Sequence, residues 1–279
     1  MSPRARRRTR AILRYTLAFS MVAVLALPIY SLSLTSVQHE IDIRTRSVRL
    51  LPRNLTLDHY REVMQPGHIV PVKEATLHSF VVSGLTGLMV VTLGSMAAYA
   101  LARFPTRSTR WLLVGLTSVY MTPTILFVIP LFILATRLGL TDTHFILVWL
   151  YSAFTLPFTV WVLKGFFERI PREIDEAARL DGCSIPQALV RVVLPLAVPG
   201  LIANYVFVFI LAWIEFLTPL LFARELRILT VALGLYRGTA DILLGQQAAA
   251  AVLATLPVAI LLFFFQRQIV EILTSGAEH

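Results

Sequence analysis

Six long apolar stretches alternate with polar segments along the chain, and most charged residues lie in the polar segments. We place the apolar stretches at Ala11–Leu34, Thr76–Ala102, Trp111–Thr136, Thr143–Leu163, Pro195–Phe222 and Gln246–Gln266. Each has about 20 residues or more, the length that a helix needs to cross roughly 30 Å of hydrocarbon. The pattern predicts an all-α polytopic membrane protein with six transmembrane helices, in a single transmembrane domain over residues 1–279.

The composition excludes a water-soluble globule. Of the 279 residues, 57% are hydrophobic and 15% are charged, whereas an ordinary soluble domain is about 25% charged. The lone cysteine, Cys183, rules out an internal disulfide and a cysteine-based metal cluster. The six histidines show no ligand spacing, so we expect no metal site.

Basic residues set the expected orientation. Six spans put both termini on one side, and fifteen of the 25 Lys and Arg residues fall on that side. The positive-inside rule therefore predicts cytoplasmic N- and C-termini. We interpret the arginine-rich start as a topogenic signal and a contact with anionic membrane lipid, and we expect no nucleic-acid partner despite the net charge of +9. The first apolar run is too long for a cleaved signal peptide, so we expect a retained span.

The segment 35–75 is predicted to be an external loop. Within it, Asn54–Met64 places apolar residues at helical spacing. Asn54 or Thr56 can cap a short helix there.

A second polar loop, residues 164–194, lies between the fourth and fifth spans on the predicted cytoplasmic side. A proline at a first helical position, followed by acidic residues, predicts a helix over Pro171–Leu180. Gly182 lies where glycine commonly follows a helix end. Ala177, Ala178 and Asp181 fall on one face of this helix, and we expect that face to point outward. Its side chains are small and are flanked by acidic residues, so the face is suited to dock in a groove on another protein.

A second helix is predicted after Gly182. Ser184 and Gln187 have capping-box spacing, and an apolar side follows them. Pro195 is expected to break that helix.

The loop also carries a family signature. It resembles the signature loop of ABC importer permeases in the order and spacing of its residues. The order is Glu176-Ala177-Ala178, three residues, Gly182, nine residues, an apolar residue, any residue and then Leu194-Pro195. The resemblance implies that the loop forms coupling helices that dock on a separate ATPase. The implied coupling residues are Glu176, Ala177, Ala178, Asp181, Gly182, Leu194 and Pro195, although Asp181 can equally be a surface charge.

Further motifs narrow the resemblance to carbohydrate importers of the maltose type, and to their smaller six-span permease. These motifs are Ala97–Phe104, Leu138–Thr143, Leu156–Phe158 and Gln266–Gly276. The chain departs from the family at Trp213-Ile214-Glu215-Phe216, where Trp-Asn-acid-Phe is usual, and at Cys183, which replaces a usual alanine.

Four residues of the fifth span are candidates for the substrate pathway: Glu215, Trp213, Asn204 and Tyr205. An intramembrane carboxylate is costly and usually faces a wet cavity or the bundle interior. For Glu215 the alternatives are an interfacial anchor or a partner for an arginine of a companion subunit. For the other three, the alternative is helix packing.

The leading hypothesis is the permease subunit of an ATP-driven carbohydrate importer in a bacterial cytoplasmic (inner) membrane. No Gly-rich phosphate loop ending in Gly-Lys-Ser/Thr occurs in the sequence. We therefore expect a non-enzymatic subunit that binds no cofactor, with ATP and Mg bound by a partner ATPase. The resemblance implies a second permease, two ATPase subunits and an extracytoplasmic sugar-binding protein. The alternative is a secondary transporter or channel that ATP does not drive.

Overall fold

The computed structural model describes residues 3–44, 54–65, 70–236 and 243–275. These residues form helices and no strand, apart from one antiparallel bridge between Gln38 and Leu55. They divide into two compact units, one within Met1–Val72 and Leu233–Thr255 and the other within Lys73–Ala232 and Leu256–His279. Each unit is described by itself.

The first unit contains α1 (Pro3–Ser36), α2 (Glu40–Ile43), α3 (Asp58–Met64) and the start of α13 (Leu244–Ser275). Polar contacts join α2 and α3 to the start of α13: the Glu40 carboxylate accepts from the backbone N–H of Gly245 at 3.1 Å, and Gln246 Nε2 donates to Glu62 Oε2 at 2.6 Å. The predicted external loop therefore contains folded helices, although its residues 45–53 and 66–69 lie outside the described part.

The short external helix is present, but neither predicted cap holds its N-cap position. The helix starts at Asp58, and its N-cap is Leu57, which makes no side-chain cap hydrogen bond. The Thr56 hydroxyl lies one residue earlier and accepts from the Asp58 backbone N–H at 3.1 Å.

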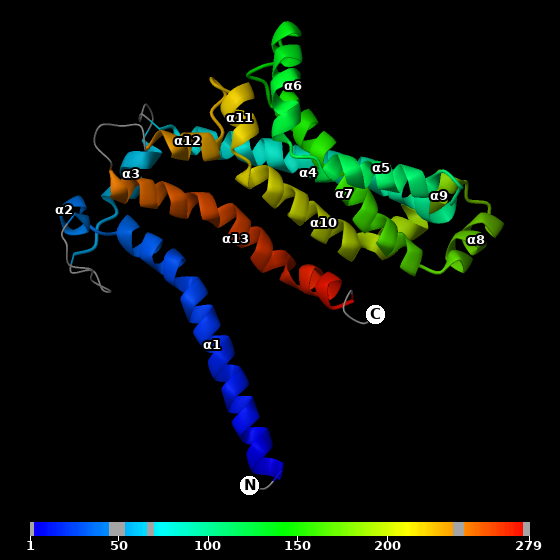
Figure 1. The fold of residues 1–279 in the computed structure, drawn as a ribbon, viewed down its shortest axis with the longest axis horizontal. Helices are drawn as coiled ribbons and strands as arrows, with labels where there is room; N and C mark the ends of the chain where they lie inside the picture. The colour runs from blue at the N-terminus through cyan, green and yellow to red at the C-terminus, as the bar shows by residue number, and fades with distance from the viewer. Residues whose placement is uncertain (1–2, 45–53, 66–69, 237–242, 276–279) are drawn as a thin grey trace. The chain divides into compact units, whose positions relative to one another are not determined.

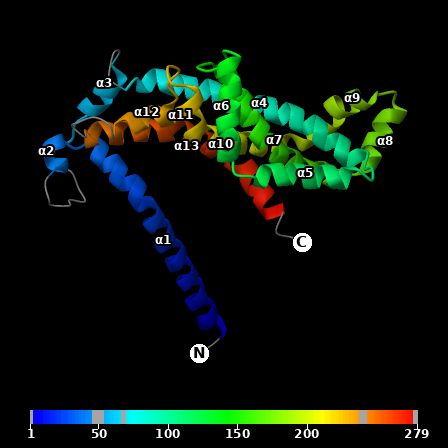
Figure 2. The ribbon, with the colours of Figure 1, turned by 45° about the horizontal axis from the view of Figure 1, so that its top comes forward.

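The second unit is a bundle with a different set of short helices at each end. It holds α4 (Val72–Arg103), α5 (Thr109–Met121), α6 (Ile125–Arg137), α7 (His144–Arg169), α8 (Arg172–Leu180), α9 (Ile185–Ala188), the π-helix η1 (Leu189–Val193), α10 (Leu194–Ile214), α11 (Leu217–Phe222) and the start of α12 (Leu229–Leu235). In Figures 1 and 2, α4, α5, α7 and α10 run along the bundle, α8 and α9 lie at one end of it, and α6 and α11 lie part of the way along α4, near the start of α7 and the end of α10.

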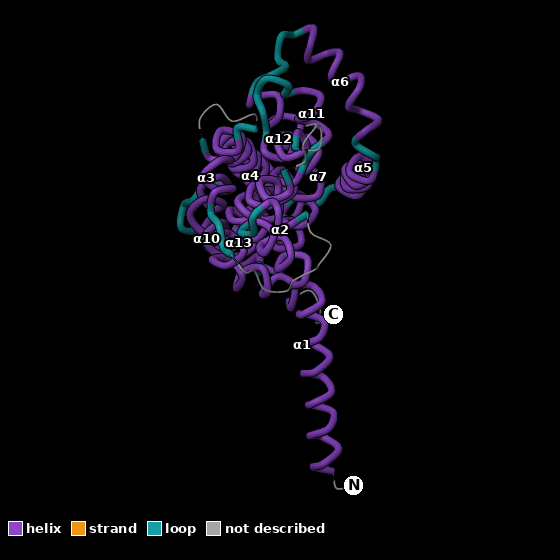
Figure 3. The backbone as a smooth tube through the Cα atoms, turned by 90° about the vertical axis from the view of Figure 1, so that its left-hand side faces the viewer, coloured by secondary structure: helices purple, strands orange, loops and turns teal. Residues whose placement is uncertain are grey.

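The predicted third span is not one straight helix. Five described helices are long and apolar enough to cross a membrane, and a sixth span exists if α5 and α6 count as one bent pair. The two helices meet at 87°, and Figure 3 shows α6 turning away from the axis of α5. The bend begins at Thr122, whose ψ of 129° is extended, because Pro123 disfavours a helical conformation in the residue before it.

The predicted fifth span differs at both ends. At its start, the expected break at Pro195 is wrong, because Ile185–Ile214 runs on as a single span with a π-helical segment just before the proline. The wider π turn accommodates a residue that cannot donate a backbone hydrogen bond. At its far end, α10 stops at Ile214 and α11 begins at Leu217, so Glu215 lies in a break rather than within a helix.

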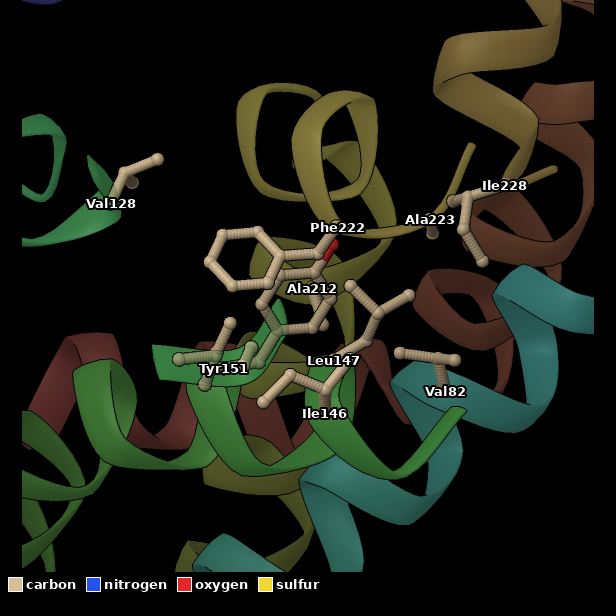
Figure 4. Close-up of a cluster of buried hydrophobic side chains, with 11 residues drawn as sticks. Val82, Val128, Ile146, Leu147, Tyr151, Ala212, Phe222, Ala223 and Ile228 are labelled. Carbon is tan, nitrogen blue, oxygen red and sulfur yellow. The ribbon is translucent and has the colours of Figure 1, made fainter. Parts of the chain in front are cut away.

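Two apolar clusters hold the second unit together. The first, shown in Figure 4, packs Leu147 and Tyr151 of α7 near Ala212 of α10 and Phe222 of α11. The second lies beneath α8 and consists of buried residues from α4, α7, η1 and α10, including Tyr99, Leu163, Phe167, Val193 and Ala197. These clusters position the two regions in which the candidate residues lie.

Candidate functional site

The helix α8 has a well-formed C-terminal cap. The backbone N–H of Cys183 donates to the Ala178 carbonyl at 3.0 Å, and that of Gly182 donates to the Arg179 carbonyl at 3.1 Å. This is the Schellman pattern, which needs a left-handed residue just past the helix. Gly182 has φ of +90°, so the predicted helix end is confirmed together with its physical reason.

The face that α8 presents outward differs from the predicted one. Glu176, Ala177 and Asp181 are exposed, but Ala178 is only 6% exposed. The prediction that Ala178 points outward is therefore wrong. Asp175 lies three residues earlier, on the same side of the helix, and is 8% exposed. The side that carries Asp175 and Ala178 is thus turned toward the bundle.

Asp175 is held by two residues at the end of α4. The Tyr99 hydroxyl donates to Asp175 Oδ1 at 2.6 Å, and Arg103 Nε forms an ion pair with Asp175 Oδ2 at 2.7 Å. Arg103 Nη2 also donates to the backbone carbonyl of Ile170 at 3.0 Å, just before α8 begins. One arginine therefore bridges both the helix and the segment that leads into it.

The anchor rests on packed apolar side chains. The Tyr99 ring meets Phe167 of α7 edge to face, with centroids 5.9 Å apart, an arrangement that stabilises aromatic pairs. Arg172 Nη2, at the start of α8, donates to the Ala102 carbonyl at 3.4 Å. Side-chain contacts therefore fix α8 to α4, and α8 also follows α7 directly in the sequence.

Sequence reasoning missed this anchor. In the sequence, Arg103 is only one of the basic residues that follow a span, and Asp175 is only one of the acidic residues that follow the first helical proline. A basic residue at the end of a span and an acid in a loop helix are each ordinary, and no spacing rule joins positions 72 residues apart in the sequence.

The remaining coupling candidates lie after α8. The predicted capping box is present, with the Ser184 backbone N–H donating to Gln187 Oε1 at 2.9 Å. Leu194 is half-buried against the cluster beneath α8, and Pro195 is exposed at the start of α10. The structure thus gathers Glu176, Ala177, Asp181 and Gly182 at the exposed end of α8, while Leu194 and Pro195 belong to the following helix.

Three of the substrate-pathway candidates are engaged in helix packing. Asn204 is 4% exposed and its Oδ1 accepts from the Thr159 hydroxyl of α7 at 3.0 Å. The Tyr205 ring covers Gly87 of α4 so closely that a Cβ there would lie 2.7 Å from Cε2 of the tyrosine. Trp213 is buried and stacks on Phe209. These contacts favour the packing alternative for all three residues.

Glu215 lies in a different setting. Its carboxylate accepts from the backbone N–H groups of Leu217 and Thr218 at 3.0–3.2 Å, and from the Tyr151 hydroxyl at 3.2 Å. It also lines a cavity of about 200 Å³. Glu215 is therefore both held by its neighbours and placed at the wall of a cavity.

Comparison with known proteins establishes the family. Residues 90–271 match the family described as binding-protein-dependent transport system inner membrane component. The chain is 34% identical to the trehalose transport system permease protein SugB of Mycobacterium tuberculosis over 98% of both chains. It is 35% identical to the inner membrane ABC transporter permease protein YcjP of Escherichia coli over 89% of both.

A solved structure shares the fold. The crystal structure of a bacterial ABC transporter involved in the import of the acidic polysaccharide alginate contains a chain with a TM-score of 0.78 and 21% identity, with 96% of this chain and 98% of that chain covered. The protein therefore belongs to the binding-protein-dependent transport system inner membrane components, the permease subunits of ABC importers, and is a multi-pass inner membrane protein.

Proposed function

We propose that this chain is one of two permease subunits of an ATP-driven carbohydrate importer, that it forms half of the translocation pathway, and that it is coupled to a separate ATPase. The family description ties transport to a binding protein. SugB, which matches this chain from end to end, is a trehalose permease. A sugar is therefore the substrate class best supported.

The anchored α8 is the observation that carries the coupling role. Its exposed surface combines acid and small side chains at Glu176, Ala177 and Asp181 with Leu180, which is 89% exposed. Its inner side is fixed to α4 by the Asp175–Arg103 pair. A helix that is exposed on one side and fixed on the other can pass the motion of a docked ATPase into the bundle.

Two ATPase subunits supply the energy in this proposal. They bind ATP and Mg, whereas this chain binds no cofactor and catalyses no reaction. Leu194 and Pro195 lie at the start of α10 and, in this proposal, transmit the motion of the loop to the fifth span.

The other partners are a second permease, an extracytoplasmic sugar-binding protein and membrane lipid. The apolar segment Ile12–Ser36 of α1 has a mean hydropathy of 2.0, and none of its most apolar window is buried. An exposed apolar helix of that length needs lipid or another membrane helix around it.

The test is Glu176→Arg, expressed with all partner subunits in lipid nanodiscs. We expect the ATPase to be lost on co-purification, or its substrate-stimulated hydrolysis to fall, because a reversed charge in a docked contact leaves an unpaired group. The matched control is Glu225→Arg, an exposed acid near α11, which should leave both readouts unchanged. Intact association with full stimulation in Glu176→Arg, or sugar uptake that an ionophore abolishes, would contradict the proposal.

A further inference from the structure

Two interrupted helices border the same cavity in the second unit. Thr122 and Thr124 come from the 87° bend between α5 and α6, and Glu215 comes from the break between α10 and α11. Non-helical backbone at membrane depth is tolerated where it is buried in protein or lines a water-filled space. The cavity of about 200 Å³ is several times the volume that one water molecule occupies.

The cavity wall is rich in hydroxyl groups. Its hydroxyl-bearing residues are Tyr120, Thr122, Thr124, Tyr151, Thr155 and Thr218. Thr122, Tyr151 and Thr155 donate to groups of their own surroundings. Within the described part of the chain, the hydroxyls of Tyr120 and Thr124 have no hydrogen-bond partner. These two groups are available to a ligand.

The Glu215 carboxylate is fully engaged by its own neighbours. Its two oxygens accept four hydrogen bonds, from the backbone N–H groups of Leu217 and Thr218 and from the Tyr151 hydroxyl, which fills the roughly four lone-pair sites of a carboxylate. None of the described residues that line the cavity is basic. The carboxylate therefore brings negative charge to the cavity wall, and this charge repels an anion.

An aromatic row leads away from the cavity. Phe154, which lines it, is followed on α7 by Phe158 and Trp161 at four- and three-residue spacing, so the three share one face. Phe158 stacks on Tyr120 with centroids 5.3 Å apart and lies 6.4 Å from Trp161. Trp161 is 60% exposed and lines a second hollow of about 590 Å³ together with Lys164 and Glu168.

We propose that Tyr120 and the row of Phe154, Phe158 and Trp161 bind an uncharged saccharide as it passes this chain, and that Glu215 excludes anionic sugars from the same site. The hydroxyls of Tyr120 and Thr124 bind sugar hydroxyl groups, while the rings pack against apolar sugar faces. This inference rests on the proposed function and adds two specific points: the smaller permease contacts the sugar itself, and the contact selects against anionic sugars.

Uptake by the complete importer, reconstituted in proteoliposomes with its binding protein, is the first test. With trehalose and maltose as probes, Tyr120→Ala and Phe158→Ala should each lower the initial rate of ATP-dependent uptake about tenfold. Trp149→Ala is the matched control, because Trp149 is also exposed on α7 but lies nine residues from Phe158 and hence on the opposite face. Its uptake should equal that of the wild type.

Saturation-transfer NMR on the complex in nanodiscs without binding protein tests the charge selection. The neutral disaccharides should give a signal that Tyr120→Ala abolishes and Trp149→Ala retains. Digalacturonate should give no signal with the wild type and a signal with Glu215→Gln, which keeps an acceptor oxygen but removes the charge.

The outcomes separate the two proposals. If no saccharide is taken up with ATP, the proposed function fails. If ATP-dependent uptake is present but unchanged in Tyr120→Ala and Phe158→Ala, only this inference fails. It fails equally if digalacturonate binds the wild type, or if the cavity variants lose the second permease on co-purification, because the cavity would then be a subunit contact.

Discussion

Arg103 Nε lies 2.7 Å from Asp175 Oδ2, and this ion pair ties the end of α4 to a loop helix far along the chain. The two side chains are 6% and 11% exposed. A buried pair of this kind is expensive to break, because the remaining charge has neither water nor a partner. The end of α4 and α8 should therefore move as one body when α8 is displaced.

Asp175→Asn should uncouple the transporter without detaching the ATPase. The substitution leaves Arg103 buried without its counter-charge, a loss of about 3–5 kcal/mol when one member of a buried pair is removed. We expect lower thermal stability in detergent and reduced substrate-stimulated ATP hydrolysis, with ATPase co-purification retained because Glu176 is intact.

Two further variants test whether the Asp175–Arg103 ion pair is the cause of this effect. Glu173→Gln removes an exposed acid from the same helix and should behave as the wild type. The double substitution Arg103→Met with Asp175→Leu replaces the pair by apolar side chains and should recover most of the stability. A double variant as unstable as the sum of the two single substitutions would show that the pair is not the unit that matters.

Tyr99→Phe should have a smaller effect of the same kind. It removes the hydroxyl that donates to Asp175 Oδ1 at 2.6 Å but keeps the ring against Phe167. A hydrogen bond to a charged group contributes about 1.5–3 kcal/mol. Thermal unfolding of the purified complex should place this variant between the wild type and Asp175→Asn, and a loss larger than that of Asp175→Asn would assign the main role to the tyrosine.

Gly182→Ala tests the end of α8 through backbone conformation alone. A Cβ at Gly182 would meet no atom within 4 Å, but φ is +90°, where a side chain costs about 1–2 kcal/mol. Gly182→Asn should cost less, because asparagine tolerates left-handed conformations better. Gly165→Ala, equally unobstructed but inside α7, should be neutral or stabilising. Equal unfolding temperatures for Gly182→Ala and Gly165→Ala would contradict this account.

The sequence predicts the features that depend on neighbouring residues. The long apolar runs and the glycine after α8 are of this kind, and both are present in the structure. The features that the sequence does not predict depend on contacts between distant segments. Ala178 turns inward because Asp175 on the same face contacts Arg103, and the packing of Asn204 depends on Thr159 of another helix.

The breaks at the cavity show the same limit. Pro123 indicates a bend, but its 87° angle is set by the packing of α6 and α11 against α7. The residues on both sides of Glu215 are apolar, so hydropathy averaged along the fifth span does not show that α10 ends at Ile214.

Gly94→Ala should force α4 and α7 apart, because the new Cβ would lie 2.5 Å from Thr159 Cγ2. The Thr159 hydroxyl donates to Asn204, so the side chain cannot rotate away without losing a buried hydrogen bond. Overpacking of this kind costs about 1–3 kcal/mol, and thermal unfolding should report it. Thr159→Ser removes the clashing methyl and keeps the hydroxyl, so adding it to Gly94→Ala should restore most of the stability. Gly84→Ala, whose Cβ would lie 3.7 Å from the Tyr205 hydroxyl oxygen, is the control and should be tolerated. A Gly94→Ala protein that Thr159→Ser does not rescue would mean that the strain arises elsewhere than at this helix crossing.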